Sequence, residues 1–258
     1  MTEGIKPKKH PAKFSDEIIA IIRDLIEKYQ MRGWLTLDPF AGVGKIFDAI
    51  PELVWRGYEL EPEWACQHPN IVTGDCVTGM HGWLANVMPE NPPEMAFAPH
   101  GIYLSRPKAI ITSPAYGNRM ADNMLPDRGA GLTHTYNMYS YKLGRPLADN
   151  NGAKYHFHRK AGGVQYRKIH TRAWRAAVDL LEPGGLFVLN TKDYSHDGIV
   201  EHVTGWHVGV LESLGMVTLE EIPAFTPGQR YGENSEIRAE HEWVIVLRKP
   251  EQGGQHAS

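Results

Sequence analysis

The stretch Asp38-Pro39-Phe40-Ala41-Gly42-Val43-Gly44 carries the clearest signal for the fold of this 258-residue chain. It follows the apolar run at residues 34–37, which reads as a strand, and it opens a segment with helical character. Gly42 and Gly44 allow the backbone to approach a ligand closely, and free N–H groups at the start of a helix attract anionic or zwitterionic groups. The stretch therefore predicts a strand, a glycine turn and a helix, with a small-molecule site at the carboxyl end of the strand.

Two other kinds of glycine-rich site fit this stretch poorly. A phosphate-binding loop needs a glycine five positions before its second glycine, and a serine or threonine after the lysine. Around the pair Gly44-Lys45, these positions are occupied by Pro39 and Ile46. The pattern Gly-x-Gly-x-x-Gly of a dinucleotide-binding turn is also absent from the sequence at this point. A tight turn that binds nothing remains the structural alternative.

Short apolar runs alternate with helical stretches along the chain, which predicts a mostly parallel sheet with helices on both faces. Helices are expected from a cap at Ser15 to about residue 30, at about residues 170–181 and at about residues 200–213. The last two apolar runs have no helix between them, so they predict an antiparallel hairpin at the edge of the sheet. The seven expected strands are residues 34–37, 54–60, 70–73, 109–112, 186–190, 217–222 and 242–247.

The composition is that of one globular domain spanning residues 1–258. Hydrophobic residues make up 42% of the chain and charged residues 22%, and the formal net charge is −3. The basic N-terminus lacks the apolar core of a secretory signal, and no run of about 18 apolar residues could span a membrane. Cys66 and Cys76 form neither a disulfide framework nor a zinc pattern, which favours a reducing, cytoplasmic compartment. Residues 251–258 are polar and glycine-rich, and we expect them to be disordered.

Residues 117–175 interrupt the alternation and concentrate positive charge. They contain eleven Lys or Arg and three acids, which gives this segment a net charge of +8. The aromatic residues interleaved with these charges are Tyr136, Tyr139, Tyr141, Tyr155, Phe157 and Tyr166. Positive charge mixed with aromatic rings is typical of contacts to a phosphate backbone and to unstacked bases. The segment is predicted to recognise nucleic acid, and the alternative is an irregular insertion whose tyrosines pack against the protein. His156 and His158 have no carboxylate or thiol partner nearby, so no metal site is expected.

Acidic side chains follow the second and third expected strands. Glu59 ends the second strand, where a carboxylate can accept both hydroxyls of a ribose. Glu61 is the alternative for the ribose, although it also suits the first turn of a helix. Asp75 ends the third strand, where it could accept a proton from an adenine amino group or cap a helix. Together with the glycine turn, these acids predict an adenosine-like ligand.

In this order, the motifs resemble those of the amino-group DNA methyltransferases, which use S-adenosylmethionine. The resemblance rests on Asp-Pro-Phe-Ala-Gly-x-Gly at residues 38–44, a strand-end Glu at position 59 and Gly-Asp at residues 74–75. The segment His-Pro-Ala-Lys-Phe-Ser at residues 10–15 is similar to one that often precedes this turn and helps to bind the methionine end. The resemblance implies a Rossmann-like methyltransferase fold. The cofactor-binding residues that it implies are Lys13, Phe14, Asp38, Pro39, Phe40, Gly42, Gly44, Glu59 and Asp75.

The segment Thr112-Ser113-Pro114-Ala115-Tyr116 ends the fourth expected strand and resembles the catalytic (Ser/Asp/Asn)-Pro-Pro-(Tyr/Phe) motif of that family. An exocyclic amino nitrogen is a poor nucleophile, because its lone pair is delocalised into the ring. A side chain and a backbone carbonyl that each accept one N–H favour a pyramidal nitrogen whose lone pair faces the methyl group. The motif implies that Ser113 and the Pro114 carbonyl are these acceptors, and that Tyr116 stacks on a base flipped out of the helix.

The motif departs from the family at Ala115, where a second proline is expected. The entropic effect of this change is only about 0.4–1 kcal/mol, too small to abolish function by itself. Serine at the first position is more typical of cytosine N4 than of adenine N6 enzymes, so the resemblance implies a DNA methyltransferase that prefers cytosine. An RNA or tRNA amino methyltransferase and a catalytically idle nucleic-acid-binding relative remain alternatives. Neither cysteine lies near the motif, which disfavours methylation of a cytosine ring carbon.

Overall fold

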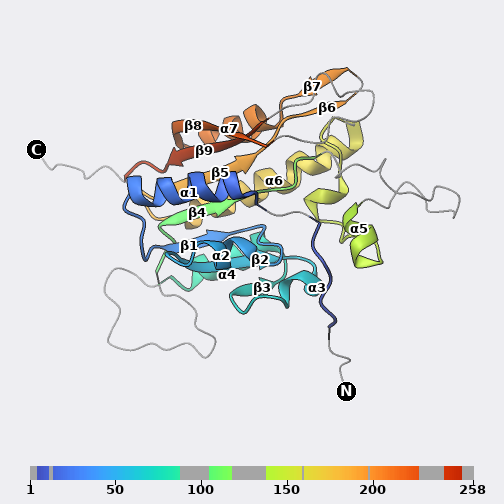
Figure 1. Ribbon diagram of the computed structural model, residues 1–258, viewed down its shortest axis with the longest axis horizontal. Coiled ribbons are helices and arrows are strands. Elements are labelled where there is room, and N and C mark those ends of the chain that lie inside the picture. The colour runs from blue at the N-terminus through green and yellow to red at the C-terminus, as the bar shows by residue number, and fades with distance from the viewer. Residues whose placement is uncertain are drawn as a thin grey trace, which may run out of the picture.

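The computed structural model describes residues 5–11, 14–87, 105–117, 138–158, 160–196, 198–226 and 241–251 (Figure 1). The strands of its main sheet are β1 (Leu35–Asp38), β2 (Val54–Glu59), β3 (Ile71–Thr73), β4 (Ala109–Thr112), β5 (Leu186–Thr191), β8 (Val217–Phe225) and β9 (His241–Arg248). The helices are α1 (Asp16–Lys28), α2 (Lys45–Ala49), α3 (Pro62–Ala65), α4 (Cys76–Ala85), α5 (Met138–Leu143), α6 (Lys160–Leu180) and α7 (Val203–Ser213), with a 3-10 turn, η2 (Gly152–Lys154).

The seven strands lie in the order β3-β2-β1-β4-β5-β9-β8. The first five of these are parallel to one another, and β9 runs antiparallel to both β5 and β8. The chain winds outward from β1 to β3 and then crosses back to β4, so the winding direction reverses between β1 and β4. At such a switch point the loops after the strands diverge and leave a crevice for a ligand.

The predicted fold class, a mostly parallel seven-stranded sheet that ends in an antiparallel hairpin, is confirmed. The predicted cap is also present, because the Ser15 hydroxyl accepts a hydrogen bond from the Ile18 amide at 3.3 Å. A small second hairpin, β6 (Tyr194–His196) with β7 (Ile199–Glu201), was not expected from the sequence. It explains why α7 begins at Val203, later than predicted.

Helices cover both faces of the sheet, and each face has its own apolar layer (Figure 1). Strand β4 shows how one strand serves both layers. Ala109 and Ile111 belong to the layer beneath α1 and α2, whereas Ile110 belongs to the layer beneath α4, α6 and α7. Side chains of a strand alternate between faces, so a fully apolar run is needed where both faces are buried.

The structure changes the interpretation of residues 117–175. Helix α6 begins at Lys160 and packs against α4, so residues 160–175 belong to the helical layer and not to an insertion. Tyr139, Phe157 and Tyr166 are buried, whereas Tyr141 is exposed. The buried rings therefore follow the packing alternative and offer no stacking surface. Residues 118–137, which belong to the same segment, lie outside the described residues.

Within the described ranges, no helix is both long enough and apolar enough to cross a membrane. The same ranges contain no group of three or more His, Cys, Asp or Glu side chains that could hold a metal ion. Both cysteines are free thiols. The tail expected to be disordered lies outside the described residues beyond Glu251.

Candidate active site

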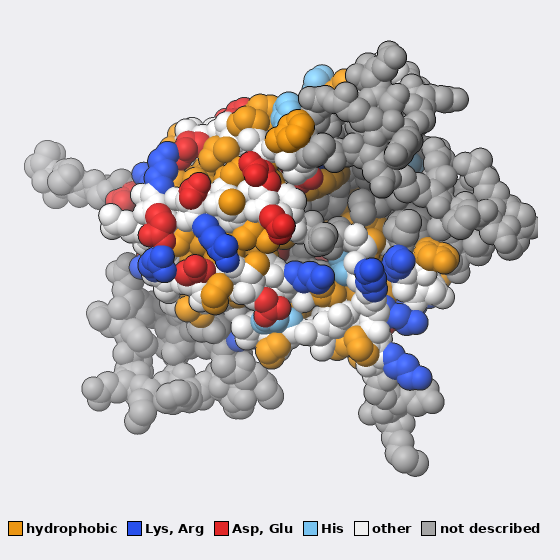
Figure 2. Space-filling view, viewed as in Figure 1, with side chains coloured by type: hydrophobic (Ala, Val, Ile, Leu, Met, Phe, Trp, Pro, Cys, Tyr) orange, Lys and Arg blue, Asp and Glu red, His pale blue; other side chains and the backbone are white. Residues whose placement is uncertain are grey.

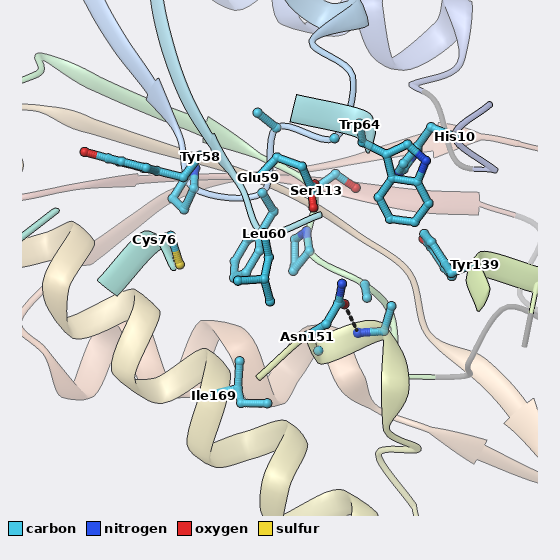
Figure 3. A pocket seen from close by; sticks show the side chains of 18 of the residues that line it. His10, Tyr58, Glu59, Leu60, Trp64, Cys76, Ser113, Tyr139, Asn151 and Ile169 are labelled. Atoms are coloured by element: carbon cyan, nitrogen blue, oxygen red, sulfur yellow. Dashed lines mark hydrogen bonds between the residues drawn. The ribbon is translucent and has the colours of Figure 1, made fainter. Parts of the chain in front are cut away.

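A cavity of about 380 Å³ opens at the carboxyl ends of the strands, above the switch point between β1 and β4. Figure 3 shows His10, Trp64 and Tyr139 together at one end of this cavity and Cys76 at the other, with Glu59 and Ser113 between them. This volume lies within the range of small-molecule and cofactor pockets. The cavity therefore joins the predicted cofactor motifs to the predicted catalytic motif.

The glycine turn after β1 forms one wall of the cavity. Gly42 and Gly44 have φ angles of 55° and 72°, a left-handed conformation that disfavours residues with a Cβ atom. Pro39, Phe40 and Gly42, which the sequence predicts to contact the cofactor, line the cavity. Gly44 does not line the cavity. It precedes α2, and a Cβ atom at this position would lie 2.9 Å from the His68 ring, so packing requires a glycine here.

Asp38 was expected to bind the cofactor, but the structure gives it an internal role. Its Oδ1 atom accepts hydrogen bonds from the Phe40 amide at 2.9 Å and from the Thr112 hydroxyl at 2.6 Å. Asp38 is buried and is not among the described residues that line the cavity, and burial raises the pKa of its carboxyl group to about 7. Asp38 thus ties the glycine turn to the end of β4, just before the predicted catalytic motif.

Glu59 occupies the equivalent place at the end of β2, but its side chain does line the cavity. Its Oε1 atom accepts a hydrogen bond from the Glu61 amide at 2.8 Å. Burial raises the pKa of the Glu59 carboxyl group to about 8, against the effect of the backbone N–H groups that it accepts. A buried carboxylate on a ligand cavity is well suited to accept two neighbouring hydroxyl groups.

Asp75 has the capping role that the sequence offered as one of two alternatives, and its side chain also lines the cavity. Its Oδ1 atom caps α4 by accepting a hydrogen bond from the Thr78 amide at 2.9 Å. Its Oδ2 atom accepts a hydrogen bond from the Asn150 side-chain amide at 2.6 Å, and both residues line the cavity. The Asp75 carboxylate is therefore oriented by the protein at the same end of the cavity as Cys76.

Residues 138–154, here called the roof segment, cover the cavity and are held by Glu61. The buried Glu61 carboxylate accepts hydrogen bonds from the Ala148 amide at 3.0 Å and from the Asn151 side chain at 2.9 Å, and it pairs with Arg145 at 2.8 Å. Arg145 also binds both oxygens of Glu63. Glu61 is thus an anchor for the roof segment. The residues around Glu61 in the sequence do not indicate this role, because its partners lie more than 80 residues away.

The N-terminal arm closes the end of the cavity near the glycine turn. Phe14 and His10 line the cavity, whereas Lys13, also predicted to bind the cofactor, lies outside the described residues. The His10 ring packs edge-on against Trp64, with centroids 4.5 Å apart, and lies 3.3 Å from where Gly42 would carry a Cβ atom. Trp64 Nε1 is buried and has no acceptor among the described residues, so an oxygen of a bound ligand would satisfy it.

The predicted catalytic residues Ser113, Pro114 and Tyr116 all line the cavity. The Tyr116 hydroxyl donates to Glu242 Oε2 at 2.8 Å, and Ser113 Oγ lies 3.2 Å from the same hydroxyl. Since Tyr116 has one proton and gives it to the carboxylate, Ser113 donates to Tyr116 and keeps its lone pairs for the cavity. Burial and the nearby Glu242 charge raise the pKa of Tyr116 well above its usual value, so this phenol stays protonated.

Glu242 and Asn190 were missing from the predicted site. Glu242 begins the last expected strand, and its Oε2 atom also accepts a hydrogen bond from the Asn190 side-chain amide at 3.1 Å. Both residues reach the site because β5 and β9 are adjacent and antiparallel, which pairs Asn190 with Val244 in the register. The adjacency of their strands in the sheet is not visible from the spacing of the two residues in the sequence.

The two carbonyl groups after Ser113 differ in their partners. The Ala115 carbonyl accepts a hydrogen bond from the Tyr166 hydroxyl at 2.6 Å. No described residue donates to the Pro114 carbonyl. The structure therefore leaves Ser113 Oγ and the Pro114 carbonyl as free acceptors in the turn that borders the cavity.

No family model matches this chain, and no curated protein matches its sequence. Solved structures do resemble it. TrmN from Thermus thermophilus has 15% identity over 90% of this chain, with a TM-score of 0.43, and this chain covers only 48% of that chain. N-methyltransferase NodS from Bradyrhizobium japonicum WM9, in complex with S-adenosyl-l-homocysteine, has 12% identity over 92% of this chain and 89% of its own, with a TM-score of 0.44. The [4+2]-cyclase SpnF has 10% identity over 96% of this chain and 87% of its own, with a TM-score of 0.49.

The chain has a Rossmann-like methyltransferase fold, as its strand order and closing antiparallel hairpin indicate. Identities of 15% or less and TM-scores below 0.5 in these three comparisons carry no information about a substrate. One fold hosts many reactions, so the reaction has to be argued from the residues of the site.

Proposed function

We propose that this protein transfers a methyl group from S-adenosylmethionine to an exocyclic amino group of a DNA base, with cytosine N4 preferred over adenine N6. The observation that carries the proposal is the shared cavity. In it, a glycine turn and a buried carboxylate at the end of β2 lie beside a Ser-Pro-Ala-Tyr turn at the end of β4.

The residues of the cavity fit the three parts of the cofactor. Asp75 and Cys76 would hold the adenine end, and Glu59 would accept the ribose hydroxyls. Gly42 and Trp64 would hold the methionine end, where the buried indole N–H suits a carboxylate oxygen. When bound, the cofactor supplies an electrophilic methyl group on a sulfonium ion. The order of Cys76, Glu59 and Trp64 along the cavity in Figure 3 supports this orientation.

The catalytic turn suits an amino nitrogen because it offers two neutral acceptors. Ser113 Oγ and the Pro114 carbonyl would each accept one N–H of the amino group, which frees the nitrogen lone pair to attack the methyl carbon. The electron pair of the broken C–S bond would stay on the sulfur, and the methylated nitrogen would release one proton to solvent. Tyr116 and Glu242 orient the Ser113 hydroxyl, so the serine oxygen accepts a hydrogen bond from the amino group and does not compete as a donor. Positioning of this kind accelerates a reaction without a covalent intermediate.

The choice of DNA rests on charge and on the resemblance of the catalytic motif. Residues 117–175 carry the net charge of +8 noted above, and the N-terminal arm beside the cavity adds Lys6, Lys8 and Lys9, all exposed. Figure 2 shows Lys and Arg side chains gathered on the side of the molecule near this arm, whereas acids and bases alternate over α1. Clustered positive charge beside the cavity supports a phosphate-bearing partner.

The test is methyl transfer with isotopically labelled S-adenosylmethionine to unmethylated DNA and, separately, to total RNA and tRNA. Nucleoside mass spectrometry identifies the product. We expect N4-methylcytosine in DNA. Label in RNA alone would favour the RNA methyltransferase alternative. Cofactor binding without label in any nucleic acid would favour the idle relative and contradict the proposal.

Replacing the side-chain acceptor tests the catalytic assignment. Ser113→Ala is expected to lower kcat about 100-fold, the scale seen when one preorganised hydrogen-bonding group of an active site is lost. The Kd for the cofactor should stay unchanged in isothermal titration. Ser213→Ala, at the exposed C-terminal end of α7, is the matched control and should keep the wild-type kcat. A fully active Ser113→Ala protein would contradict the assignment.

A further inference from the structure

A chain of buried hydrogen bonds runs from helix α6 to the backbone of the catalytic turn, and the proposed reaction does not use it directly. Trp174 Nε1 lies 2.9 Å from His207 Nδ1, and His207 Nε2 lies 2.9 Å from the Tyr166 hydroxyl. The Tyr166 hydroxyl lies 2.6 Å from the Ala115 carbonyl oxygen. Trp174, His207 and Tyr166 have no solvent-exposed surface. Helices α6 and α7 thus reach the turn through three buried side chains.

The donors in this chain can be assigned from chemistry alone. An indole nitrogen only donates, so His207 Nδ1 accepts the hydrogen bond from Trp174. Burial holds the pKa of His207 well below its usual value, so the ring is neutral and carries its one proton on Nε2. Nε2 therefore donates to the Tyr166 hydroxyl, and the phenolic proton of Tyr166 is directed to Ala115. Trp174 sets this order by fixing the tautomer of His207.

The position of the Tyr166 hydroxyl is fixed by its surroundings. His170 Nδ1 lies 2.8 Å from the Tyr166 backbone carbonyl and donates to it, and the two rings are 4.1 Å apart. On the far side of Tyr116, the Gly117 carbonyl accepts hydrogen bonds from the Phe157 amide at 2.8 Å and from the Tyr194 hydroxyl at 3.1 Å. The backbone is therefore held on both sides of Tyr116 by groups from the packed core.

We infer that Tyr166 is a positioning residue for methyl transfer, and that its hydrogen bond to the Ala115 carbonyl replaces the restraint of a second proline at position 115. This inference rests on the proposed function. A proline at position 115 would fix its own φ angle and would hold Pro114 in the extended region. Alanine leaves these rotations free. The bond from Tyr166 fixes the Ala115 carbonyl, the next group along the backbone, and thereby limits the rotations from that side. The Pro114 carbonyl then stays available to the amino group.

The first test compares Tyr166→Phe and Ala115→Pro, alone and combined. Tyr166→Phe removes one hydroxyl and keeps the buried ring, and we expect kcat to fall about tenfold with an unchanged Kd for the cofactor. Ala115→Pro alone should keep kcat within about twofold of the wild type. The double variant should recover kcat to within about threefold of the wild-type value. A purely structural role of Tyr166 would not produce this recovery. A Tyr166→Phe protein within twofold of the wild-type kcat, or a double variant without recovery, would overturn the inference.

A second readout does not depend on activity. Ala115-Tyr116 is the only Ala-Tyr pair in the sequence, so labelling Ala with 13C at the carbonyl and Tyr with 15N gives one cross-peak in an HNCO spectrum. This peak reports directly on the Ala115 carbonyl. We expect it to move upfield in Tyr166→Phe, because the carbonyl loses its donor. The matched control is Tyr29→Phe, which removes a hydroxyl bound to Glu220 at the end of α1 and should leave the peak in place.

The two readouts separate the failure of this inference from the failure of the proposed function. Wild-type protein that methylates no nucleic acid would contradict the proposed function, while the shift of the Ala115 peak would still establish the restraint. An Ala115 peak that stays in place in Tyr166→Phe would overturn the inference, whatever the activity of the wild type.

Discussion

The two walls of the cavity are built in different ways. The first wall, here called the cradle (residues 38–75), consists of strand ends and the turns that follow them, and its shape is set by the parallel register of β1, β2 and β3. The second wall, the roof segment, lies far along the chain from the cradle. It is attached through side chains, above all through the carboxylate of Glu61 and its partners Arg145 and Asn151.

Because of this difference, the cradle supplies the ligand contacts, whereas the roof segment covers the cavity. In the cradle, the backbone positions each side chain, so a substitution can remove a ligand contact without disturbing the fold. The roof segment, in contrast, takes three of its polar contacts to the cradle from one buried carboxylate, that of Glu61, so loss of this carboxylate should weaken both the stability of the protein and the binding of a ligand beneath the roof segment. Two residues within the cradle also differ in role. Asp38 and Glu59 end neighbouring strands and are both buried, but only Glu59 lines the cavity.

The largest effect on cofactor affinity is expected from Glu59→Gln. The amide keeps one acceptor for the Glu61 backbone but turns the other oxygen into a donor, so the ribose hydroxyls lose a charged acceptor. A hydrogen bond to a charged group contributes about 1.5–3 kcal/mol, so Kd should rise about 10- to 100-fold in isothermal titration.

Asp38→Asn is the matched control, since it makes the same chemical change at the neighbouring strand end, away from the cavity. Its Kd should stay within about threefold of the wild type, because the amide oxygen still accepts from Phe40 and Thr112. Equal losses of affinity in the two variants would contradict the division of roles between Asp38 and Glu59.

An intermediate effect is expected from removing the anchor of the roof segment. Glu61→Ala deletes three hydrogen-bonding contacts, each worth about 1 kcal/mol, so the free energy of unfolding should fall by about 2–3 kcal/mol. Cofactor affinity should fall as well. Glu63→Ala is the matched control: its partly exposed pair with Arg145 should contribute less than about 1 kcal/mol. Denaturant titration measures both variants, and indistinguishable midpoints would show that Glu61 does not hold the roof segment.

The smallest effect is the change in cofactor affinity over a single pH unit. Glu59 has a pKa of about 8 in the free protein, and only its ionised form can accept both ribose hydroxyls. Kd should therefore fall as the pH rises toward 8, by at most about tenfold for each unit, and then level off. Glu59→Gln should lose this dependence. A wild-type Kd that does not change between pH 6 and pH 9 would contradict the ionised state of Glu59 in the complex.

The same raised pKa values fix the sign of a stability effect. Since the folded protein binds the protons of Asp38 and Glu59 more tightly than the unfolded chain, these groups stabilise the fold most below pH 4. This contribution is lost as the pH rises through about 7 for Asp38 and about 8 for Glu59. A bound cofactor that ionises Glu59 would offset part of that loss.

The sequence by itself determined the sheet, the glycine turn and the place of the Ser113–Tyr116 turn. These features are local. Apolar runs define strands, and the turn needs a glycine at position 42 because its φ angle there is left-handed. Residues at the carboxyl ends of parallel strands must meet at one edge of the sheet. For this reason Glu59, Asp75 and Ser113 were found in sequence and lie on one cavity.

Only the tertiary structure decided which polar groups form hydrogen bonds inside the protein and which face the cavity. Asp38 and Gly44 looked like cofactor contacts, but Thr112 and His68, distant in sequence, give them internal roles. Antiparallel pairing of β9 with β5 places Glu242 beside the Ser113–Tyr116 turn. The packing of α6 places the Tyr166 hydroxyl against the same turn. Such contacts depend on long-range packing and burial, which the spacing of residues along a chain does not encode.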